Sequence, residues 1–331
     1  MVRIDKILKL TWSLLTIGQE PRPLLEDFNV GHQINAVIFT ANGECLVSGG
    51  REGVRVSRVQ DGKRMATMKA WDVYCLAVSK DRRCIAAGTY LGHVLVWDAA
   101  TYKNVFTHRE GPHTITAVDF SPDSTRLVTA SDNRTATIWD IATWRRVRTL
   151  HHEGSLIAAK YSPKGDRIAT ATQKSIRVWD GDDGRLLLDI PAQVTTGHNP
   201  GLLWFNHHLF VVSDNKIEQI DASTGSVVSE WPVPDSEYTS SIVLPRHEAF
   251  ITYATRCTVT FWDTSTHAQL GLVSEYQDIY SIALSPDDRF LAIAAESGKI
   301  TVKRVSHITV RFVYCQIAAH LNLNSISLPS I

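Results

Sequence analysis

The sequence predicts an all-β fold, a single seven-bladed β-propeller made of four-stranded antiparallel blades. The first observation behind this prediction is a Trp-Asp pair that recurs along the chain. Successive pairs are 42, 40 and 83 residues apart, and the last interval is about twice the others. A period of about 40–45 residues that carries a Trp-Asp pair is typical of a propeller blade. The four pairs are Trp97-Asp98, Trp139-Asp140, Trp179-Asp180 and Trp262-Asp263.

The second observation is that three further copies keep the interval without keeping the Trp-Asp pair. Asp221, in the segment IEQIDASTG, divides the long interval into 41 and 42 residues. Arg58, in GVRVSRVQDG, lies 40 residues before Asp98, and Arg304, in GKITVKRV, lies 41 residues after Asp263. The period therefore gives seven copies.

The third observation is the order of short strands and turns within each copy. In the third copy, apolar runs at residues 115–120 and 127–130, an alternating run at 135–139 and a last run at 147–150 predict four strands. The segment Ser121-Pro122-Asp123-Ser124 predicts the first turn, because proline fixes φ while Asp and Ser side chains bond to their own backbone. Similar Ser-Pro turns are found at residues 162–165 and 285–288.

The chain divides into three parts. Residues 1–21 form an N-terminal extension whose apolar residues are spaced as in a short helix. Its basic residues before an apolar run also resemble a weak signal peptide, but no small-residue cleavage site follows. Residues 22–305 form the propeller, and residues 306–331 form a C-terminal tail.

The two ends of the ring are expected to meet through residues 22–30. This strand should complete the last blade, formed by residues 277–305, because an open ring would expose sheet edges. Residues 306–314 also alternate apolar and polar side chains, so an extra strand from the tail is a competitor for the same edge. We favour closure by the N-terminal strand, with the tail loosely attached.

The composition gives no sign of a nucleic-acid or membrane partner. The 34 basic and 34 acidic residues cancel, so no overall field attracts nucleic acid or anionic lipid. No segment approaches the ~20 apolar residues that span a bilayer. The five cysteines lack metal-ligand spacing, and we expect free thiols in the cytoplasm, with the nucleus as the alternative. Cys45 and Cys84 are expected to be small core residues.

With these repeats in view, residues 22–305 resemble the WD-repeat β-propeller family. The resemblance is carried by the in-phase Trp-Asp copies and by the Gly31-His32 pair of the first copy. It implies seven blades around a central channel, with loops on two faces. It also implies a hydrogen-bonded set of His, Ser or Thr, Asp and Trp within each blade. The third copy matches this set best, with His113, Thr129, Asn133 and Trp139 in order.

The other copies match this set only in part, and their residues are predicted to be structural. In the fourth copy His152 and Trp179 match, but Gln173 takes the Asp position. In the second and sixth copies Trp97 and Trp262 are present without the Asp. A buried Trp or His with a satisfied polar partner stabilises a blade, which is the role expected for all of these side chains.

Nothing in the sequence has the pattern of a catalytic, cofactor or metal site. No His-Glu-x-x-His, Gly-x-Ser-x-Gly or Gly-x-x-x-x-Gly-Lys is present. The adjacent His151-His152 pair would point to opposite faces of a strand, which argues against joint metal binding. The acidic segment 180–183 predicts a turn, because Gly184 and Pro191 stand where a calcium loop needs ligands. We therefore expect no enzyme activity, no cofactor and no metal.

Function on such a scaffold is expected on the loops. One candidate surface consists of the turns after the Trp-Asp pairs, where large residues replace the glycine that is usual in the family. Exposed Trp and Tyr side chains often anchor interfaces. The alternative is that Trp144 folds back on the blade edge and the neighbouring arginines are solvated. The candidates on this face are Tyr102, Trp144 and Arg145.

The second candidate surface is the opposite face. It is formed by the loops between second and third strands and by the loops that enter each first strand. The resemblance implies that this face often receives partner peptides. The candidates there are Arg51, Trp71, Tyr90, His113, Arg134, Tyr238 and Arg256.

These observations predict a non-catalytic protein-interaction scaffold that presents loops to protein or peptide partners. It would act as a monomeric propeller or as a component of a complex. A structural subunit of an obligate multiprotein complex is the alternative. A propeller enzyme or small-molecule binder is the third hypothesis, and it requires polar residues that converge at the channel mouth.

Overall fold

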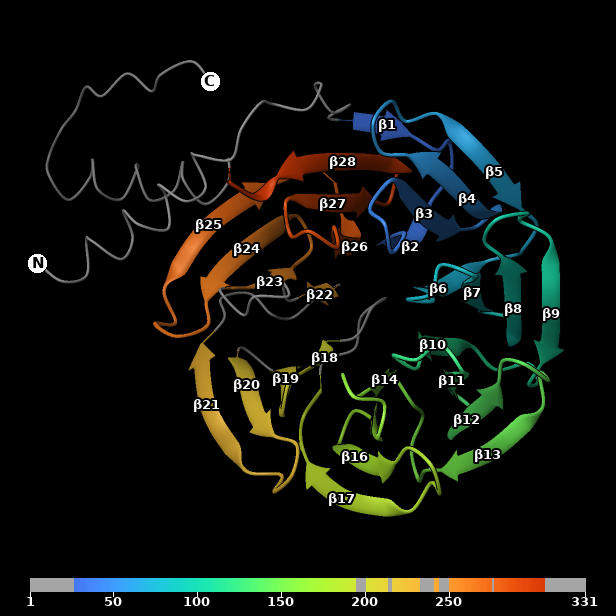
Figure 1. Ribbon diagram of the computed structural model, residues 1–331. Helices are drawn as coiled ribbons and strands as arrows, with labels where there is room; N and C mark the ends of the chain where they lie inside the picture. The colour runs from blue at the N-terminus through green and yellow to red at the C-terminus, as the bar shows by residue number, and fades with distance from the viewer. Residues whose placement is uncertain are drawn as a thin grey trace, which may run out of the picture.

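The chain forms a ring of seven four-stranded antiparallel sheets, arranged as blades around a central axis (Figure 1). This confirms the fold class that the sequence predicts. The residues 1–21 and nearly all of the tail 306–331 lie outside the described residues, so the helix and the extra strand predicted there stay predictions. The computed structural model describes residues 27–194, 201–213, 216–232, 241–243, 250–275 and 277–306.

The first four blades follow the chain in order. Blade 1 contains β2 (Ile34–Phe39), β3 (Cys45–Gly50), β4 (Gly53–Arg58) and β5 (Arg64–Met68). Blade 2 contains β6 (Val73–Val78), β7 (Cys84–Thr89), β8 (His93–Asp98) and β9 (Asn104–Arg109). Blade 3 contains β10 (Ile115–Phe120), β11 (Arg126–Ser131), β12 (Thr135–Asp140) and β13 (Arg146–His151). Blade 4 contains β14 (Ala158–Tyr161), β15 (Arg167–Ala171), β16 (Ser175–Asp180) and β17 (Leu186–Pro191).

The last three blades have the same strand order, and the degenerate fifth copy forms a complete blade. Blade 5 contains β18 (Leu202–Phe205), β19 (His208–Ser213), β20 (Lys216–Asp221) and β21 (Val227–Pro232). Blade 6 contains β22 (Ser241–Val243), β23 (Phe250–Ala254), β24 (Thr258–Asp263) and β25 (Gln269–Ser274). Blade 7 contains β26 (Ile279–Leu284), β27 (Phe290–Ala295), β28 (Lys299–Arg304) and β1 (Asp27–Asn29).

The ring closes because its last blade combines both ends of the propeller. Strand β1 pairs antiparallel with β28, with Phe28 opposite Ile300 and Asn29 opposite Lys299. The Phe28 side chain packs on the hydrophobic cluster between blades 7 and 1. The predicted closure by the N-terminal strand is thus confirmed, and it covers part of an edge that an open ring would leave unpaired.

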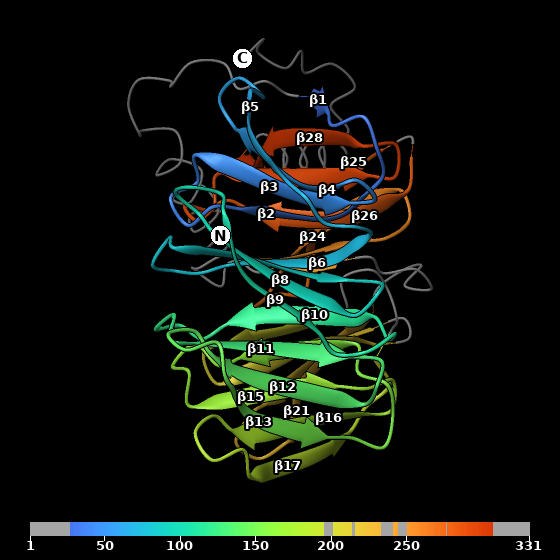
Figure 2. The ribbon, with the colours of Figure 1, turned by 90° about the vertical axis from the view of Figure 1, so that its right-hand side faces the viewer.

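The hydrophobic core lies between neighbouring blades. Figure 2 shows the sheets stacked beside one another, so that each sheet faces a neighbour on both sides. Between blades 2 and 3, Ala77 and Val96 of one blade pack with Val118, Leu127 and Trp139 of the next. This arrangement explains why second strands such as β11 are buried along almost their whole length and read as continuous apolar runs in the sequence.

The innermost strands of neighbouring blades are joined by side chains that bond to backbone atoms. In three of the four bonds the partners lie about one repeat apart, and the fourth joins blade 1 to blade 7 across the closure of the ring, so each bond joins two blades. Buried polar groups of this kind are normally hydrogen-bonded. The bonds are Asn35 Nδ2 to Val73 O (2.8 Å), Cys75 Sγ to Ile115 O (3.3 Å), Thr116 Oγ1 to Leu156 O (2.9 Å) and Val37 N to Ser281 Oγ (3.1 Å).

The cysteine assignment differs in part from the expectation. Cys75 is buried between blades 2 and 3, whereas Cys45 and Cys84 are only half-buried. The reason is that Cys75 lies on an innermost strand, while the other two begin second strands at the edge of a blade. All four described cysteines are free.

The aspartate of each Trp-Asp pair closes the turn to the outermost strand. In blade 3, Asp140 Oδ1 accepts hydrogen bonds from the Thr143 backbone N (2.8 Å) and from Thr143 Oγ1 (2.6 Å). Asp221 does the same in blade 5 with Ser223 N (2.8 Å) and Thr224 N (2.9 Å). The hydrogen bond from Ser223 Oγ, followed by these backbone bonds, lowers the pKa of Asp221 to about 2. The turn therefore explains why the fifth copy retains the aspartate although it lacks the tryptophan.

Candidate functional site

The hydrogen-bonded set within blade 3 is present, but with a different first member. Trp139 Nε1 donates to Thr129 Oγ1 (3.1 Å), and Thr129 Oγ1 donates to Glu110 Oε1 (3.0 Å). Glu110 thus occupies the place expected for His113, which is exposed in the loop before β10. Asn133 does not join the set, because its Oδ1 atom accepts from the backbone N (2.9 Å) and Oγ1 of Thr135 in its own turn.

Blade 4 contains the histidine form of the same set. Trp179 Nε1 donates to Thr170 Oγ1 (2.7 Å), which lies 3.2 Å from His152 Nε2. His152 precedes Thr170 by 18 residues, and Glu110 precedes Thr129 by 19. In blade 3, a count of 18 or 19 residues back from Thr129 leads to Glu110. The expectation of His113 came instead from the Gly-Pro-His sequence at residues 111–113.

In blade 2 the matching residue, Trp97, is buried between blades 1 and 2. The same positions are less well satisfied in blade 6. In blade 6, Trp262 Nε1 and Thr252 Oγ1 are both buried, and within the described residues neither has a hydrogen-bond partner. Unpaired buried polar atoms cost about 1–3 kcal/mol each, so blade 6 lacks a stabilising contact that blades 3 and 4 have.

The turns after the Trp-Asp pairs pack against the preceding blade. Trp144 is half-buried, and its ring stacks on Phe106 of β9 with centroids 4.7 Å apart. Tyr102 is half-buried and packs against the hydrophobic cluster between blades 1 and 2. Arg145 is exposed. This differs from the expectation of exposed aromatic tips and matches the alternative in which Trp144 folds back on the blade edge.

The opposite face, which we call the entry face, carries the turns between second and third strands and the loops that enter the first strands. Trp71 is 76% exposed and Tyr90 is 37% exposed there. Arg51, His113, Arg134 and Arg256 are also exposed on this face, whereas Tyr238 lies outside the described residues. The structure thus brings six of the seven candidates to one face.

Backbone hydrogen bonds join the loops of the entry face from blade to blade. Arg51 N donates to Gln33 O (3.3 Å), Asp72 N to Arg51 O (3.3 Å) and Tyr90 N to Asp72 O (3.0 Å). Thr114 Oγ1 then donates to Tyr90 O (3.4 Å). Each loop therefore holds the next, which fixes the backbone from which their exposed side chains project.

Tyrosines and carboxylates share this face. The Tyr74 and Tyr90 rings meet edge to face, with centroids 4.9 Å apart. Burial raises the pKa of Tyr74, and the neighbouring Tyr90 raises it further. Burial and then the Asp72 carboxylate raise the pKa of Tyr90. These phenols therefore stay neutral hydrogen-bonding groups at physiological pH. Arg256 is held by Asp278 (Nε to Oδ1, 3.0 Å).

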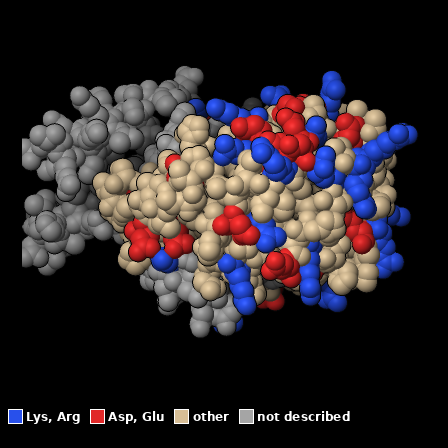
Figure 3. All heavy atoms as spheres, turned by 90° about the horizontal axis from the view of Figure 1, so that it is seen from below, with Lys and Arg blue, Asp and Glu red and all other residues tan. Residues whose placement is uncertain are grey.

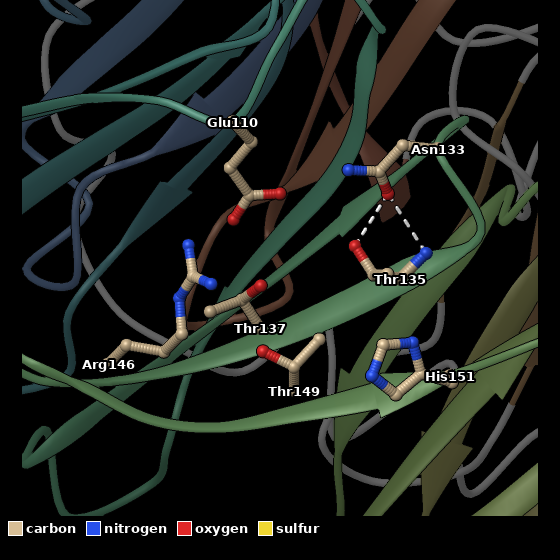
Figure 4. A pocket seen from close by; sticks show the side chains of 7 residues that line it. All are labelled: Glu110, Asn133, Thr135, Thr137, Arg146, Thr149 and His151. Atoms are coloured by element: carbon tan, nitrogen blue, oxygen red, sulfur yellow. Dashed lines mark hydrogen bonds between the residues drawn. The ribbon is translucent and has the colours of Figure 1, made fainter.

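A polar pocket of about 280 Å³ lies at the outer part of blade 3, under the loop that follows β9 (Figure 4). Glu110 and Arg146 lie at one end of it, and Asn133 and His151 lie at the other. Burial raises the pKa of Glu110, while the Thr129 and Thr137 hydroxyls and the Arg146 guanidinium oppose that rise. The lining residues are Glu110, Asn133, Thr135, Thr137, Arg146, Thr149 and His151.

The remaining features concern metals, membranes and surface charge. Among the described residues, no three His, Cys, Asp or Glu side chains are placed to share a metal ion. No helix within the described ranges has the length and apolar character needed to cross a membrane. On the face shown in Figure 3, basic and acidic side chains are interspersed over the described surface.

Comparison with known proteins gives repeated matches of moderate identity. The profile of the WD domain, G-beta repeat, matches residues 62–98, 101–140 and 144–180. The chain is 30% identical over 112 residues to the Transcriptional corepressor LEUNIG_HOMOLOG of Arabidopsis thaliana, covering 33% of this chain and 14% of that protein. It is 24% identical over 237 residues to Periodic tryptophan protein 2 of Arabidopsis thaliana, covering 70% and 22%.

A third relative and a solved structure extend the comparison. Eukaryotic translation initiation factor 3 subunit I of Pyricularia oryzae is 29% identical over 109 residues, which cover 33% of this chain and 31% of that protein. The chain thus spans less than a third of the length of these three relatives. A chain of the solved structure titled Crystal Structure of Mitotic Checkpoint Complex superposes with a TM-score of 0.74 at 16% identity, covering 88% of this chain and 97% of that one. That likeness shows the shared fold. The chain belongs to the WD40-repeat β-propeller family.

Proposed function

We propose that the chain is a non-catalytic scaffold whose protein or peptide partner docks on the entry face. The observation that carries the proposal is the exposure of Trp71 (76%) near Tyr90 (37%). Exposed aromatic side chains are the residues that most often dominate interface energetics. The hydrogen bonds between the loops hold the backbone that carries these two side chains in place before a partner arrives, which lowers the entropic cost of binding.

The contrast between the two faces supports the choice of the entry face. On the face of the Trp-Asp turns, Trp144 is engaged with Phe106, so its aromatic surface is used within the fold. On the entry face, Trp71 lies in the loop between β5 and β6 and is mostly exposed. The neighbouring Asp72 N and O atoms are both bonded to adjacent loops. A partner that covers Trp71 would therefore gain apolar contact without disturbing the blades.

The test is binding by the double variant Trp71→Ala, Tyr90→Ala. A partner would first be captured from extract with the wild-type chain and identified, and its dissociation constant would then be measured with purified proteins. We expect the double variant to bind at least about tenfold more weakly. Leu272→Ala is the matched control, because Leu272 is an exposed apolar residue (45%) on the outer strand β25. Equal affinity of wild type and double variant would place the docking surface elsewhere.

A second candidate function is that of a subunit that requires a permanent complex. The observation that favours it is the set of buried polar atoms without hydrogen-bond partners in blades 5 and 6, where the described residues include Trp231 Nε1, Thr252 Oγ1 and Trp262 Nε1. Such groups weaken these blades in the isolated chain. The relative named as a subunit of translation initiation factor 3 is in keeping with this role.

Hydrogen exchange of the purified chain tests the second candidate. A permanent subunit should show faster exchange in β19–β24 than in β6–β16, and added partner should slow it. Uniform slow exchange and a stable monomer on size-exclusion chromatography would favour the independent scaffold instead.

A further inference from the structure

The outer rim of the ring carries its charges in two separate sectors. In each of blades 1 to 6, the rim runs from the position of the Trp-Asp aspartate to the end of the outermost strand. These segments contain eight Lys or Arg and three Asp or Glu residues in blades 1 to 3, but one and seven in blades 4 to 6. We call the first sector the basic rim (residues 58–68, 98–109 and 140–151) and the second the acidic rim (residues 180–191, 221–232 and 263–274).

The three strands of the basic rim are neighbours in space. β5, β9 and β13 follow one another along the outside of the ring (Figures 1 and 2). At the right-hand margin of Figure 3, on the side of β9 and β13, Lys and Arg side chains predominate. The net charge of zero for the whole chain is therefore accompanied by a local separation of charge.

Most basic side chains of the basic rim have no counter-charge. Arg58 is paired with Asp61 (Nη1 to Oδ2, 3.1 Å), and Arg146 lies close enough to the buried Glu110 to affect its pKa. The carboxylates of Asp98 and Asp140 accept hydrogen bonds from their own turns. The six other basic side chains are exposed, and within the described ranges none of them forms an ion pair: Lys63, Arg64, Lys103, Arg109, Arg145 and Arg148.

The acidic rim, in contrast, is partly neutralised by neighbouring strands. Asp189 accepts a hydrogen bond from Arg177 of β16 (2.9 Å), and Glu230 accepts one from Lys216 of β20 (2.8 Å). Charged side chains on edge strands discourage edge-to-edge pairing of sheets, and either sign of charge serves that purpose. Protection of the edges therefore explains why the rim is charged, but it does not explain why the two signs are sorted.

Each outermost strand of the basic rim also exposes an aliphatic side chain at the same place. Met65, Val105 and Val147 are exposed, and each is the second residue of its strand. Exposed aliphatic groups suit contact with apolar side chains of a protein, whereas single-stranded nucleic acid is bound by aromatic side chains on which its bases stack. The aromatic residues of the basic rim are half-buried: Tyr102, Phe106 and Trp144.

We propose that the basic rim binds an acidic segment of a partner protein, in which aliphatic residues are interspersed among Asp and Glu. The carboxylates of the segment pair with the six exposed basic side chains, and its aliphatic residues contact Met65, Val105 and Val147. Complementary charges of this kind speed association and select the partner. The basic rim lies on the outside of the ring, so the inference does not rest on the docking proposed for the entry face.

The probe is a fluorescein-labelled peptide of Glu-Glu-Val repeats, about 12 residues long, which spans about 40 Å when extended. It is titrated into the full chain and followed by fluorescence anisotropy. A Glu-Glu-Ser peptide of the same length keeps the charge and lacks the aliphatic side chains. An oligouridylate of similar charge tests the nucleic-acid alternative.

Two variants with the same change in net charge locate the site. The rim variant replaces one exposed basic residue in each of blades 1 to 3: Arg64→Glu, Lys103→Glu and Arg145→Glu. The control variant replaces exposed lysines in turns outside the basic rim: Lys80→Glu, Lys164→Glu and Lys174→Glu. Thermal melting of both variants shows whether a loss of binding reflects unfolding.

We expect the wild type and the control variant to bind the Glu-Glu-Val peptide equally, with an affinity that falls as salt is added. The rim variant should bind it at least about tenfold more weakly. The Glu-Glu-Ser peptide should bind the wild type several-fold more weakly than the Glu-Glu-Val peptide does.

The opposite results would overturn the proposal. Absence of binding to the wild type would remove the acidic partner, and equal binding by the two variants would remove the location. Equal affinity for the two peptides would exclude the aliphatic contacts. Tighter binding of the oligouridylate would assign the basic rim to nucleic acid. Salt-sensitive self-association of the wild type in analytical ultracentrifugation, lost in the rim variant, would assign it to a second copy of the chain.

Discussion

The Trp144 ring lies nearly parallel to the Phe106 ring, with an interplanar angle of 13° and centroids 4.7 Å apart. This contact joins the turn after β12 to the outermost strand of the preceding blade. His267 stacks on Trp231 in the same way between blades 6 and 5, with centroids 4.4 Å apart. Both turn residues have positive φ, 53° for Trp144 and 56° for His267. The recurrence shows that large residues at these turns fasten one blade to the next.

Trp144→Ala should therefore destabilise the fold. The half-buried ring loses its stack on Phe106 and exposes the core edge beside it, so we expect the free energy of unfolding to fall by about 2 kcal/mol. Chemical denaturation followed by circular dichroism measures this change. The adjacent exposed Arg145→Ala should change it by less than about 0.5 kcal/mol. A Trp144→Ala protein as stable as wild type would show that the stack contributes nothing.

Thr129→Val should also destabilise, through hydrogen bonds and not through volume. Valine keeps the shape of threonine, but it leaves both Trp139 Nε1 and Glu110 Oε1 without the partner that the structure gives them. We expect a loss of about 1–3 kcal/mol in the free energy of unfolding. Thr170→Val in blade 4 breaks the equivalent bonds of Trp179 and His152 and should behave alike. If both variants melt as the wild type does, these networks have no net stabilising effect.

Glu110 should make the chain less stable as pH rises through the acidic range. Burial raises its pKa in the folded state above the ordinary value, so the folded chain binds more protons than the unfolded chain between the two pKa values. Stability therefore falls as pH increases across that window, which starts near the ordinary pKa of about 4.3.

Glu110→Gln removes this titration and should be at least as stable as wild type at pH 7. The measurement is the free energy of unfolding of both proteins between about pH 4 and pH 8. The difference between them should grow in favour of the variant as pH rises. A variant that becomes relatively less stable with rising pH would contradict the assignment.

His152 should make the chain less stable as pH falls, which is the opposite of the effect of Glu110. Burial, followed by the charge of Arg177, lowers its pKa in the folded state to about 4. The unfolded chain then binds more protons between about pH 6.5 and pH 4, so stability is lost as pH falls through that range, by at most about 3 kcal/mol. In His152→Gln, the free energy of unfolding should therefore fall less between about pH 6.5 and pH 4 than it does in the wild type. His151→Gln, at an exposed neighbouring position, is the control and should leave that fall unchanged.

Much of the fold could be predicted because it is encoded locally and repeated. The Trp-Asp interval, the Ser-Pro turns and the alternating third strands each depend on residues close together in the chain. Asp221 is an example of this local encoding, because the turn that it closes requires hydrogen bonds only from Ser223 and Thr224. The fifth blade was therefore predictable without its tryptophan.

The candidate surfaces were less predictable, because exposure depends on distant partners. Trp71 and Trp144 both lie in loops of the sequence, yet Trp71 is exposed while Trp144 is covered by Phe106. Phe106 belongs to another repeat, so no local pattern identifies this contact. His113 was expected in the network that Glu110 occupies, and there the spacing could have identified Glu110, which precedes Thr129 by 19 residues as His152 precedes Thr170 by 18.

By itself, the sequence determined the number of blades and the order of their strands, since both follow from a local pattern repeated about every 40 residues. It favoured closure of the ring by residues 22–30 but left residues 306–314 as a competitor for the same edge. Only the tertiary structure decided which side chains meet between blades. It alone brought Glu110 over the threonines of β12 and β13, and left Trp71 uncovered. The physical reason is that contacts across a blade interface join residues a whole repeat apart, and their outcome depends on how side chains pack rather than on strand propensity.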